Sequence, residues 1–303
     1  MIFFRIFLIF FFFFIFFKAI NSWTFKEYQK KYSYVIEKKI NQFKERKNNI
    51  KSCEIPTVDR INSNSYVIIG HAYGRAGRGY KQNYKLNEKL INFLSNNNNK
   101  IKLVIFNGDV FGDPNESVWS YLNNTFEKLN LNYIVAPGNH DLYGSKNTKN
   151  LEKVFFKFFN YDFPLEIDDK NNQFILRNSN NNLFLNSNEL KKYTQESVFV
   201  ENFFFIQHHN FINEFRYLVH DRGKNIRLPN IKNFFNENIF NKKIEYNFII
   251  GDSGAYKYLD RLSCRSYKNL RFIFNGLGDT NSDRIILIEN SKIKSFVLKK
   301  REK

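Results

Sequence analysis

Most histidines of this 303-residue chain stand in short polar clusters that follow apolar, strand-like runs. Four of the five histidines fall in such clusters, which random placement would rarely produce. The clusters are GHAYG at 70–74, NGDVFGD at 107–113, GNHD at 138–141, HHN at 208–210 and GDSGAY at 251–256. Their histidine, aspartate and asparagine side chains offer nitrogen and oxygen donors of the kind that Mn, Fe or Zn ions bind. The clusters are therefore candidates for parts of one site.

The apolar runs before these clusters alternate with helix-like stretches, which indicates an α/β fold. The first part of the chain predicts strands at 65–70, 101–106 and 132–137, with helices at 86–94 and near 117–129. Further strands are expected at 202–207 and 246–250 and in LRFIFNG and DRIILIEN, and the asparagine run at 96–99 is expected to be a loop. Ligands of open α/β sheets bind beyond the carboxyl ends of the strands, so the clusters should converge in space.

With its clusters in this order, each after a strand, the sequence resembles the calcineurin-like metallophosphoesterases over roughly residues 60–290. That family has the ordered motifs Asp-x-His, Gly-Asp, Gly-Asn-His-Asp/Glu, a strand-end His and Gly-His-x-His. The third is matched fully by 138–141, the second by Gly108 and Asp109, and QHHNF looks like the fourth. The resemblance implies a four-layer α/β/β/α fold, a β-sandwich flanked by helices, and phosphoester hydrolysis by metal-bound hydroxide.

The resemblance also implies a role for each matched residue. Asp109 would bridge two divalent ions, and Asn139 would give one of them a neutral amide oxygen. His140 would donate to the transition state or the leaving group rather than bind metal, and Asp141 would orient its ring through a hydrogen bond. His208 or His209 would bind one ion, and His208 fits the family spacing better.

Two motifs depart from the family pattern. Where the family has Asp-x-His this chain has His71, Ala72 and Tyr73, and where the family has Gly-His-x-His it has Gly-Asp-Ser-Gly at 251–254. Asp has thus become His71 and His has become Asp252, which looks like an exchange of ligand types between the two motifs.

The exchange implies two unequal metal sites. One site would keep four donors suited to Mn, Fe or Zn, namely Asp109, Asn139, His208 and Asp252. The other would keep His71 and Asp109, with Tyr73 as an uncommon further ligand and none from Gly254. This second site would bind weakly, bind only with substrate present, or be empty, so the chain would hold one or two ions.

Three side chains near the first cluster are candidates for substrate binding: Tyr73, Arg75 and Arg78. The arginines lie in the Gly-rich GRAGRG and could pair bidentately with phosphate oxygens, or belong to a solvated loop. His220 and Asp221 could supply a replacement metal ligand, although an exposed His-Asp pair explains them more simply.

The first twenty residues, MIFFRIFLIFFFFFIFFKAI, do not belong to the fold. The apolar run at 6–17 has signal-peptide length, but with snorkelling Arg5 and Lys18 the segment reaches the length of a membrane span. Bulky Phe17 and Ile20 stand at the −3 positions of the candidate cleavage sites, where a small residue is needed. We therefore expect an uncleaved signal-anchor rather than a removed signal peptide.

This assignment predicts three parts: the anchor or signal peptide at 1–20, a charged helical connector at 21–60 and a metallophosphoesterase domain at 61–300. Cys53 and Cys264 form no Cys-x-x-Cys pair, which excludes zinc-ribbon and thioredoxin-like sites. They could pair in an oxidising compartment or remain free thiols. The net charge of +18 favours anionic partners, but without an RNA-binding signature or a recognition helix no sequence-specific nucleic-acid binding is expected.

Three functions remain open on the sequence. The first is a metal-dependent phosphoesterase of monoesters or diesters, anchored to a membrane and facing the extracytoplasmic side, or secreted. The second is a catalytically impaired member of the fold that binds a phosphorylated ligand or partner. The third is a structural protein held on anionic lipid by its charge. Asp109, Asn139 and His140 together favour the first, because a binding module has little need for that trio.

Overall fold

The computed structural model describes residues 23–74, 84–144, 150–181, 190, 193, 199–219, 228–235, 243–253 and 260–299, with side chains from residue 31 onward. Arg75, Arg78, His220, Asp221 and Gly254 lie outside these residues, as does the expected anchor at 1–20. Among the described residues, every helix is too short or too polar to cross a bilayer.

Two sheets form the centre of the protein. The seven-stranded sheet runs in the order β1 (Lys51–Ser52), β10 (Leu262–Tyr267), β11 (Leu270–Asn275), β9 (Glu245–Ile250), β8 (Asn202–Gln207), β7 (Asn172–Leu176) and β6 (Leu165–Asp169). The six-stranded sheet runs in the order β2 (Thr57–Val58), β13 (Lys292–Val297), β12 (Arg284–Glu289), β3 (Ser65–Ile69), β4 (Ile101–Asn107) and β5 (Tyr133–Ala136). Their facing sides bury one apolar cluster that includes Ile68, Ile105, Phe204 and Ile249.

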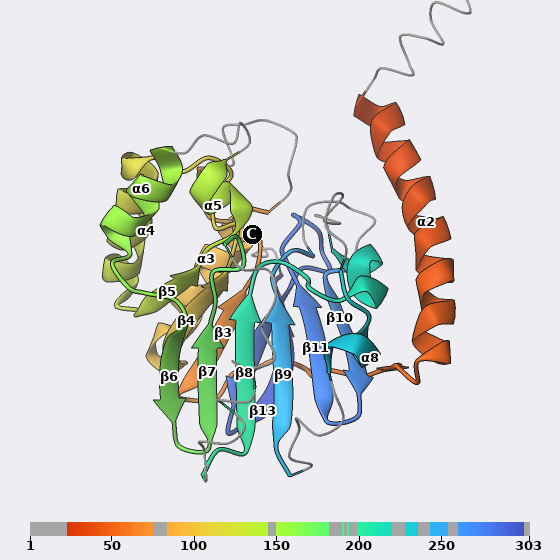
Figure 1. Ribbon diagram of the computed structural model, residues 1–303. Helices are drawn as coiled ribbons and strands as arrows, with labels where there is room; N and C mark the ends of the chain where they lie inside the picture. Colours follow the sequence, from red (N-terminus) through yellow and green to blue (C-terminus); the bar gives the residue numbers. More distant parts are fainter. Residues whose placement is uncertain are drawn as a thin grey trace, which may run out of the picture.

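Helices cover the outer faces of both sheets. Asn87 and Asn115 cap the first turns of α3 (Glu88–Asn97) and α4 (Glu116–Leu129), as asparagine commonly does. The other helices of the described residues are α2 (Trp23–Lys47), α5 (Asn139–Tyr143), α6 (Asn150–Phe158), α8 (Ile231–Phe234) and the 3-10 helices η2 (Asn98–Lys100) and η3 (Asn213–Leu218). In Figure 1, α4, α5 and α6 gather on one side of the molecule and α2 and α8 on the other.

Each outer face has its own core. Trp119 and Phe126 of α4 and Leu90 of α3 pack on the six-stranded sheet. On the seven-stranded sheet, a phenylalanine-rich layer joins Phe205 and Phe272 to Phe215 of η3. Helices, two sheets and further helices therefore form the expected α/β/β/α arrangement, and the four-layer fold is confirmed.

The parallel strands decide where polar residues meet. β3, β4 and β5 are parallel neighbours, and so are β7, β8, β9 and β11. Their carboxyl ends lie at one edge of the sandwich, where all five polar clusters begin, as predicted (Figure 1). The asparagine run at 96–99 is not a loop, because it completes α3 and enters η2.

A disulfide between Cys53 and Cys264 ties the chain before β3 to the edge of the seven-stranded sheet. It resolves the alternative left open by the sequence in favour of pairing. Cys53 also donates its backbone N–H to the Cys264 carbonyl at 3.2 Å, so the crosslink continues the pairing of β1 with β10.

Replacing both Cys53 and Cys264 with serine should lower the free energy of unfolding by about 2–5 kcal/mol. The reason is that the unfolded chain regains freedom between residues that are 211 positions apart. Denaturant titration of the oxidised wild type and the double variant measures the change, and reduced wild type should match the variant. Equal midpoints for all three samples would contradict the prediction.

Candidate active site

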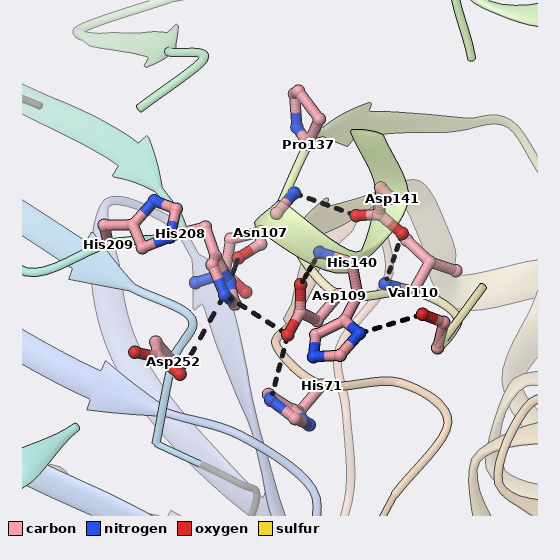
Figure 2. A network of polar contacts seen from close by, with 12 residues as sticks. His71, Asn107, Asp109, Val110, Pro137, His140, Asp141, His208, His209 and Asp252 are labelled. Atoms are coloured by element: carbon pink, nitrogen blue, oxygen red, sulfur yellow. Dashed lines mark hydrogen bonds and ion pairs between the residues drawn. The ribbon is translucent and has the colours of Figure 1, made fainter. Parts of the chain in front are cut away.

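Five of the predicted site residues are gathered at the shared edge of the sheets. His71 follows β3, Asp109 follows β4, His208 follows β8 and Asp252 follows β9, while His140 lies on α5 after β5. Figure 2 shows the imidazoles of His71, His140 and His208 around the Asp109 carboxylate, with Asp252 beyond His208. The four strand-end residues are at most 1% exposed.

Asp109 reaches this position through a left-handed backbone conformation. Its φ of 53° and the φ of 52° at His71 are left-handed conformations that cost a non-glycine residue free energy. Gly108 and Gly138 make the close approach possible, because a Cβ on Gly108 would lie 2.4 Å from the His208 ring and one on Gly138 would lie 2.2 Å from Asp109 Oδ1. The glycines of Gly-Asp and Gly-Asn-His-Asp thus leave the space that Asp109 and His208 occupy.

Two histidine nitrogens converge on one carboxylate oxygen. His71 Nε2 lies 3.2 Å and His208 Nε2 3.4 Å from Asp109 Oδ2. These are ion-pair distances without hydrogen-bond geometry, so both buried ring nitrogens lack a hydrogen-bond partner. Asp109 Oδ1 accepts a hydrogen bond from the backbone N–H of His140 at 3.0 Å. Asp109 therefore keeps Oδ2 for the two histidines.

Charges around Asp109 set the protonation of the two histidines. Burial alone would raise the pKa of Asp109, but the charges of His208 and His140 hold this pKa well below its usual range. Burial would lower the pKa of His208, but Asp109, Asp252 and Asp141 together raise it to about 9. At His71 the effect of burial prevails and lowers the pKa. His208 is therefore the cation and His71 the neutral ring.

His140 is oriented by a group that the sequence did not single out. Its Nδ1 donates to the Gly112 carbonyl at 2.8 Å, which leaves Nε2 for other partners. The expected hydrogen bond between the His140 ring and the Asp141 carboxylate is not formed, since the ring Nδ1 pairs with Gly112. Asp141 instead accepts hydrogen bonds from three backbone N–H groups. As the third residue of α5 it accepts from Gly138 and caps the helix, and it also accepts from Val110 and Phe111 of the turn after β4.

Asp141 is therefore a positioning residue for the turn that carries Asp109 and for the start of α5, which carries His140. It is fully buried, and burial together with the charge of Asp109 raises its pKa to about 7. Its three backbone contacts join the 108–111 turn to the start of α5.

The adjacent histidines 208 and 209 point in different directions. His208 faces Asp109, and its Nδ1 lies 3.3 Å from the Asn107 carbonyl. The His209 ring turns away in Figure 2, and its Nδ1 lies 3.0 Å from Ser179 Oγ. The geometry therefore favours His208 as the metal ligand of the two.

Tyr73, Asn139 and Asp252 complete the set of predicted site residues that the structure describes. Tyr73 is 3% exposed, with its ring centroid 4.9 Å from that of His71. Burial and the nearby carboxylates raise its pKa well above the usual value, so it is a neutral phenol. Half-buried Asn139 is the first residue of α5, and Asp252 Oδ1 lies 3.9 Å from His208 Nε2.

The donors fit divalent ions, although they are not assembled as a closed cage. Two ligand atoms about 2.1 Å from one ion lie roughly 3.0–3.4 Å apart, and the contacts of Asp109 Oδ2 with the two rings fall in that range. The rings reach Asp109 separately, with centroids 6.1 Å apart, as a bridging carboxylate requires. Within the described ranges, no three His, Cys, Asp or Glu side chains surround one point closely enough to hold an ion as they stand.

Three contacts at the site were missed from the sequence: the Gly112 and Asn107 carbonyls and the Ser179 hydroxyl. Every residue type has a backbone carbonyl, so residue types do not predict these two acceptors. The only signal was that Asn107 and Gly112 both lie in the polar cluster at 107–113. Ser179 lies in an Asn-rich stretch shortly after β7 (Asn172–Leu176). The sequence did not predict β7, so Ser179 was not recognised as a residue that follows a strand.

Comparisons with known proteins give a family and several distant structural likenesses. Residues 69–276 match the calcineurin-like phosphoesterase family, whereas no curated protein matches the chain by sequence. A dimetal phosphatase from Danio rerio is 10% identical, with a TM-score of 0.44, and the match covers 78% of this chain and 99% of that one. A purple acid phosphatase from yellow lupin is 11% identical, with a TM-score of 0.47 and coverage of 82% and 56%. A 5'-nucleotidase from Candida albicans is 13% identical, with a TM-score of 0.33 and coverage of 77% and 49%.

The family match spans more than half of the chain and includes every described residue of the site. This family uses divalent metal ions to hydrolyse phosphoesters, in keeping with the donor set around Asp109. The chain belongs to the calcineurin-like phosphoesterase family and is a hydrolase of phosphoester bonds.

Proposed function

We propose that Asp109 bridges two divalent-ion positions, one on the His208 side with Asn139 and Asp252 and one on the His71 side. The observation that carries this proposal is the convergence on Asp109 Oδ2 of two buried ring nitrogens that have no hydrogen-bond partner. The ions would be Mn, Fe or Zn, which accept mixed nitrogen and oxygen donors. Bound there, they would neutralise phosphate charge and activate water.

His140 would hold the proton for the leaving group. Its Nδ1 is engaged by Gly112, so Nε2 is the ring atom that can exchange a proton with substrate. Asp109 and Asp141 fix the start of α5 and with it the His140 backbone. The ring therefore needs little rearrangement before it acts.

The two ion positions would not bind metal with equal affinity. Asp252 adds a second carboxylate on the His208 side, 3.9 Å from the His208 ring nitrogen. On the His71 side, Tyr73 is a neutral phenol and a poor metal ligand. The replacement of the family's aspartate by His71 is the observation behind the alternative function, a catalytically impaired member that binds a phosphorylated ligand or partner. The presence of Asp109, Asn139 and His140 together favours hydrolysis instead.

We further propose that the enzyme is membrane-anchored through residues 1–20 and faces the extracytoplasmic side, with secretion as the alternative. The disulfide between Cys53 and Cys264 supports an oxidising compartment. The apolar run at 6–17 supports the anchor. The phosphorylated substrate is a monoester or a diester.

His140→Ala should lower the rate of phosphoester hydrolysis by about 100-fold to 10,000-fold with metal content near that of wild type. Asn139→Ala should instead lose metal first and activity as a consequence, because its amide oxygen is a proposed ligand. Hydrolysis of generic monoester and diester substrates, paired with metal analysis, measures both. If metal-loaded wild type hydrolyses neither substrate while His140→Ala binds phosphorylated ligands equally well, the impaired-member function replaces the proposal.

His208→Ala should lose most of the bound metal, whereas His209→Ala should keep it. Both changes remove a buried imidazole, but only the ring of His208 reaches Asp109. The metal-to-protein ratio after loading with Mn or Zn distinguishes them, and thermal unfolding shows that both variants fold. Equal losses, or a wild type that stays metal-free, would contradict the ligand assignment.

The full-length protein should fractionate with membranes and retain residues 1–20, because Phe17 and Ile20 disfavour cleavage. Resistance to extraction by high salt or carbonate, together with N-terminal sequencing, tests this expectation. A mature N-terminus near residue 20 on a freely soluble protein would establish secretion instead.

A further inference from the structure

Helix α2 carries an apolar stripe on the side that faces away from the sheets. Between residues 31 and 47 five large apolar side chains are exposed by 45–65%: Tyr32, Val35, Ile36, Ile40 and Phe43. Elsewhere in the described residues, only Tyr84 and Phe199 are large, apolar and exposed. At about 100° per residue, four members of the stripe fall within an arc of roughly 80°, and Val35 lies about 60° beyond it.

The opposite face of α2 is fixed to the rest of the protein. Glu45 accepts hydrogen bonds from Tyr217 OH at 2.9 Å and from Arg265 Nε at 3.0 Å. Asn48, just beyond the helix, donates to Glu214 Oε1 at 2.8 Å. Tyr34 packs in the core of the seven-stranded sheet. Helix α2 stands beside the sandwich in Figure 1, and these contacts hold the stripe on its exposed face.

The charges around the stripe are basic. Exposed Lys39 and Arg46 lie on the same face, between Val35 and the other four members, and exposed Lys47 lies within the arc of those four, about one turn beyond Phe43. Of the two acidic residues between 31 and 47, Glu45 is buried against Arg265, and half-buried Glu37 lies about 60° beyond Ile40 and accepts a hydrogen bond from Ser33. An exposed helical face that combines large apolar side chains with lysine and arginine suits the interface of an anionic bilayer.

A groove next to the stripe extends this surface. It has a volume of about 500 Å³ between α2 and η3, and it passes Ile40. Lys44 and Arg216 line it together with Glu37, so it carries two positive charges and one negative charge. Its chemistry suits an anionic lipid headgroup whose acyl chains lie against the stripe.

We infer that the exposed stripe of α2, Tyr32 to Phe43, lies in the headgroup region of an anionic lipid bilayer. A second copy of the chain is a poorer occupant, because pairing two stripes would place the exposed cations of both helices in one interface. Anionic lipid instead neutralises these charges. The inference does not depend on the chemistry at Asp109, so it stands or falls separately from the proposed function.

A fluorescence-quenching experiment on the full chain distinguishes contact of the stripe with lipid from membrane binding by residues 1–20. Ile40→Cys, labelled with an environment-sensitive dye, reports on the stripe, and Glu127→Cys on α4 is the matched exposed control. The two native cysteines form the disulfide and do not take the label. The protein is reconstituted into vesicles of about 30% phosphatidylserine that carry nitroxide quenchers at headgroup depth.

We expect at least about threefold stronger quenching at position 40 than at position 127, and a smaller difference in pure phosphatidylcholine. Adding Ile36→Glu and Phe43→Glu should reduce quenching at position 40 to the level of the control. Asn96→Glu with Asn124→Glu, which adds the same charge away from α2, should not. Thermal unfolding checks that each variant folds.

Equal quenching at positions 40 and 127 in anionic vesicles would overturn the inference. A dimer in sedimentation that the two glutamates on α2 abolish, combined with an unquenched position 40, would assign the stripe to a second copy instead. If position 40 is unquenched and no dimer forms, the inferred contact with the bilayer is excluded as well, and the stripe is assigned to a soluble partner.

Discussion

The arrangement of the site depends on one buried charge, the carboxylate of Asp109, which is 1% exposed. A carboxylate so far from water is costly unless cations or hydrogen-bond donors surround it. The fold supplies the His140 backbone N–H on one oxygen and two imidazole nitrogens facing the other. His208 carries the compensating positive charge, and a divalent ion at the same place would compensate more strongly. The need to balance Asp109 thus links the clusters after β3, β4, β5 and β8.

Bringing these clusters together requires the two sheets to meet closely at their carboxyl edge. The side-chain amides of Asn107 on β4 and Asn275 on β11 form a hydrogen bond of 3.0 Å across the junction. A Cβ on Gly251 would lie 1.8 Å from the Asn107 carbonyl, so the end of β9 touches the end of β4 directly. The left-handed backbone at His71 and Asp109 costs on the order of 1–3 kcal/mol per residue. The large cores on both sides of each sheet offset this strain.

The sequence predicted what depends on pattern and missed what depends on contacts between distant segments. Buried parallel strands such as β4 and β8 are continuous apolar runs that end in polar clusters, so their positions were confirmed within a residue or two. β6 and β13 were missed because alternating Glu, Asp and Lys residues hide strands that face solvent on one side. Asp141 was assigned the wrong contact, since no pattern shows that backbone N–H groups from the 108–111 turn compete for its oxygens.

The exchange of ligand types between the first and last motifs changes where negative charge lies, but not how much there is. Relative to the family pattern, a carboxylate has moved from the end of β3 to the end of β9, where Asp252 stands beside His208. That carboxylate is one reason why the pKa of His208 rises to about 9 while the pKa of His71 falls. A cation on the His208 side would therefore lie near the carboxylates of Asp109 and Asp252, whereas one on the His71 side would share Asp109. Unequal affinity of the two proposed positions would follow from the exchange itself, without further change in the fold.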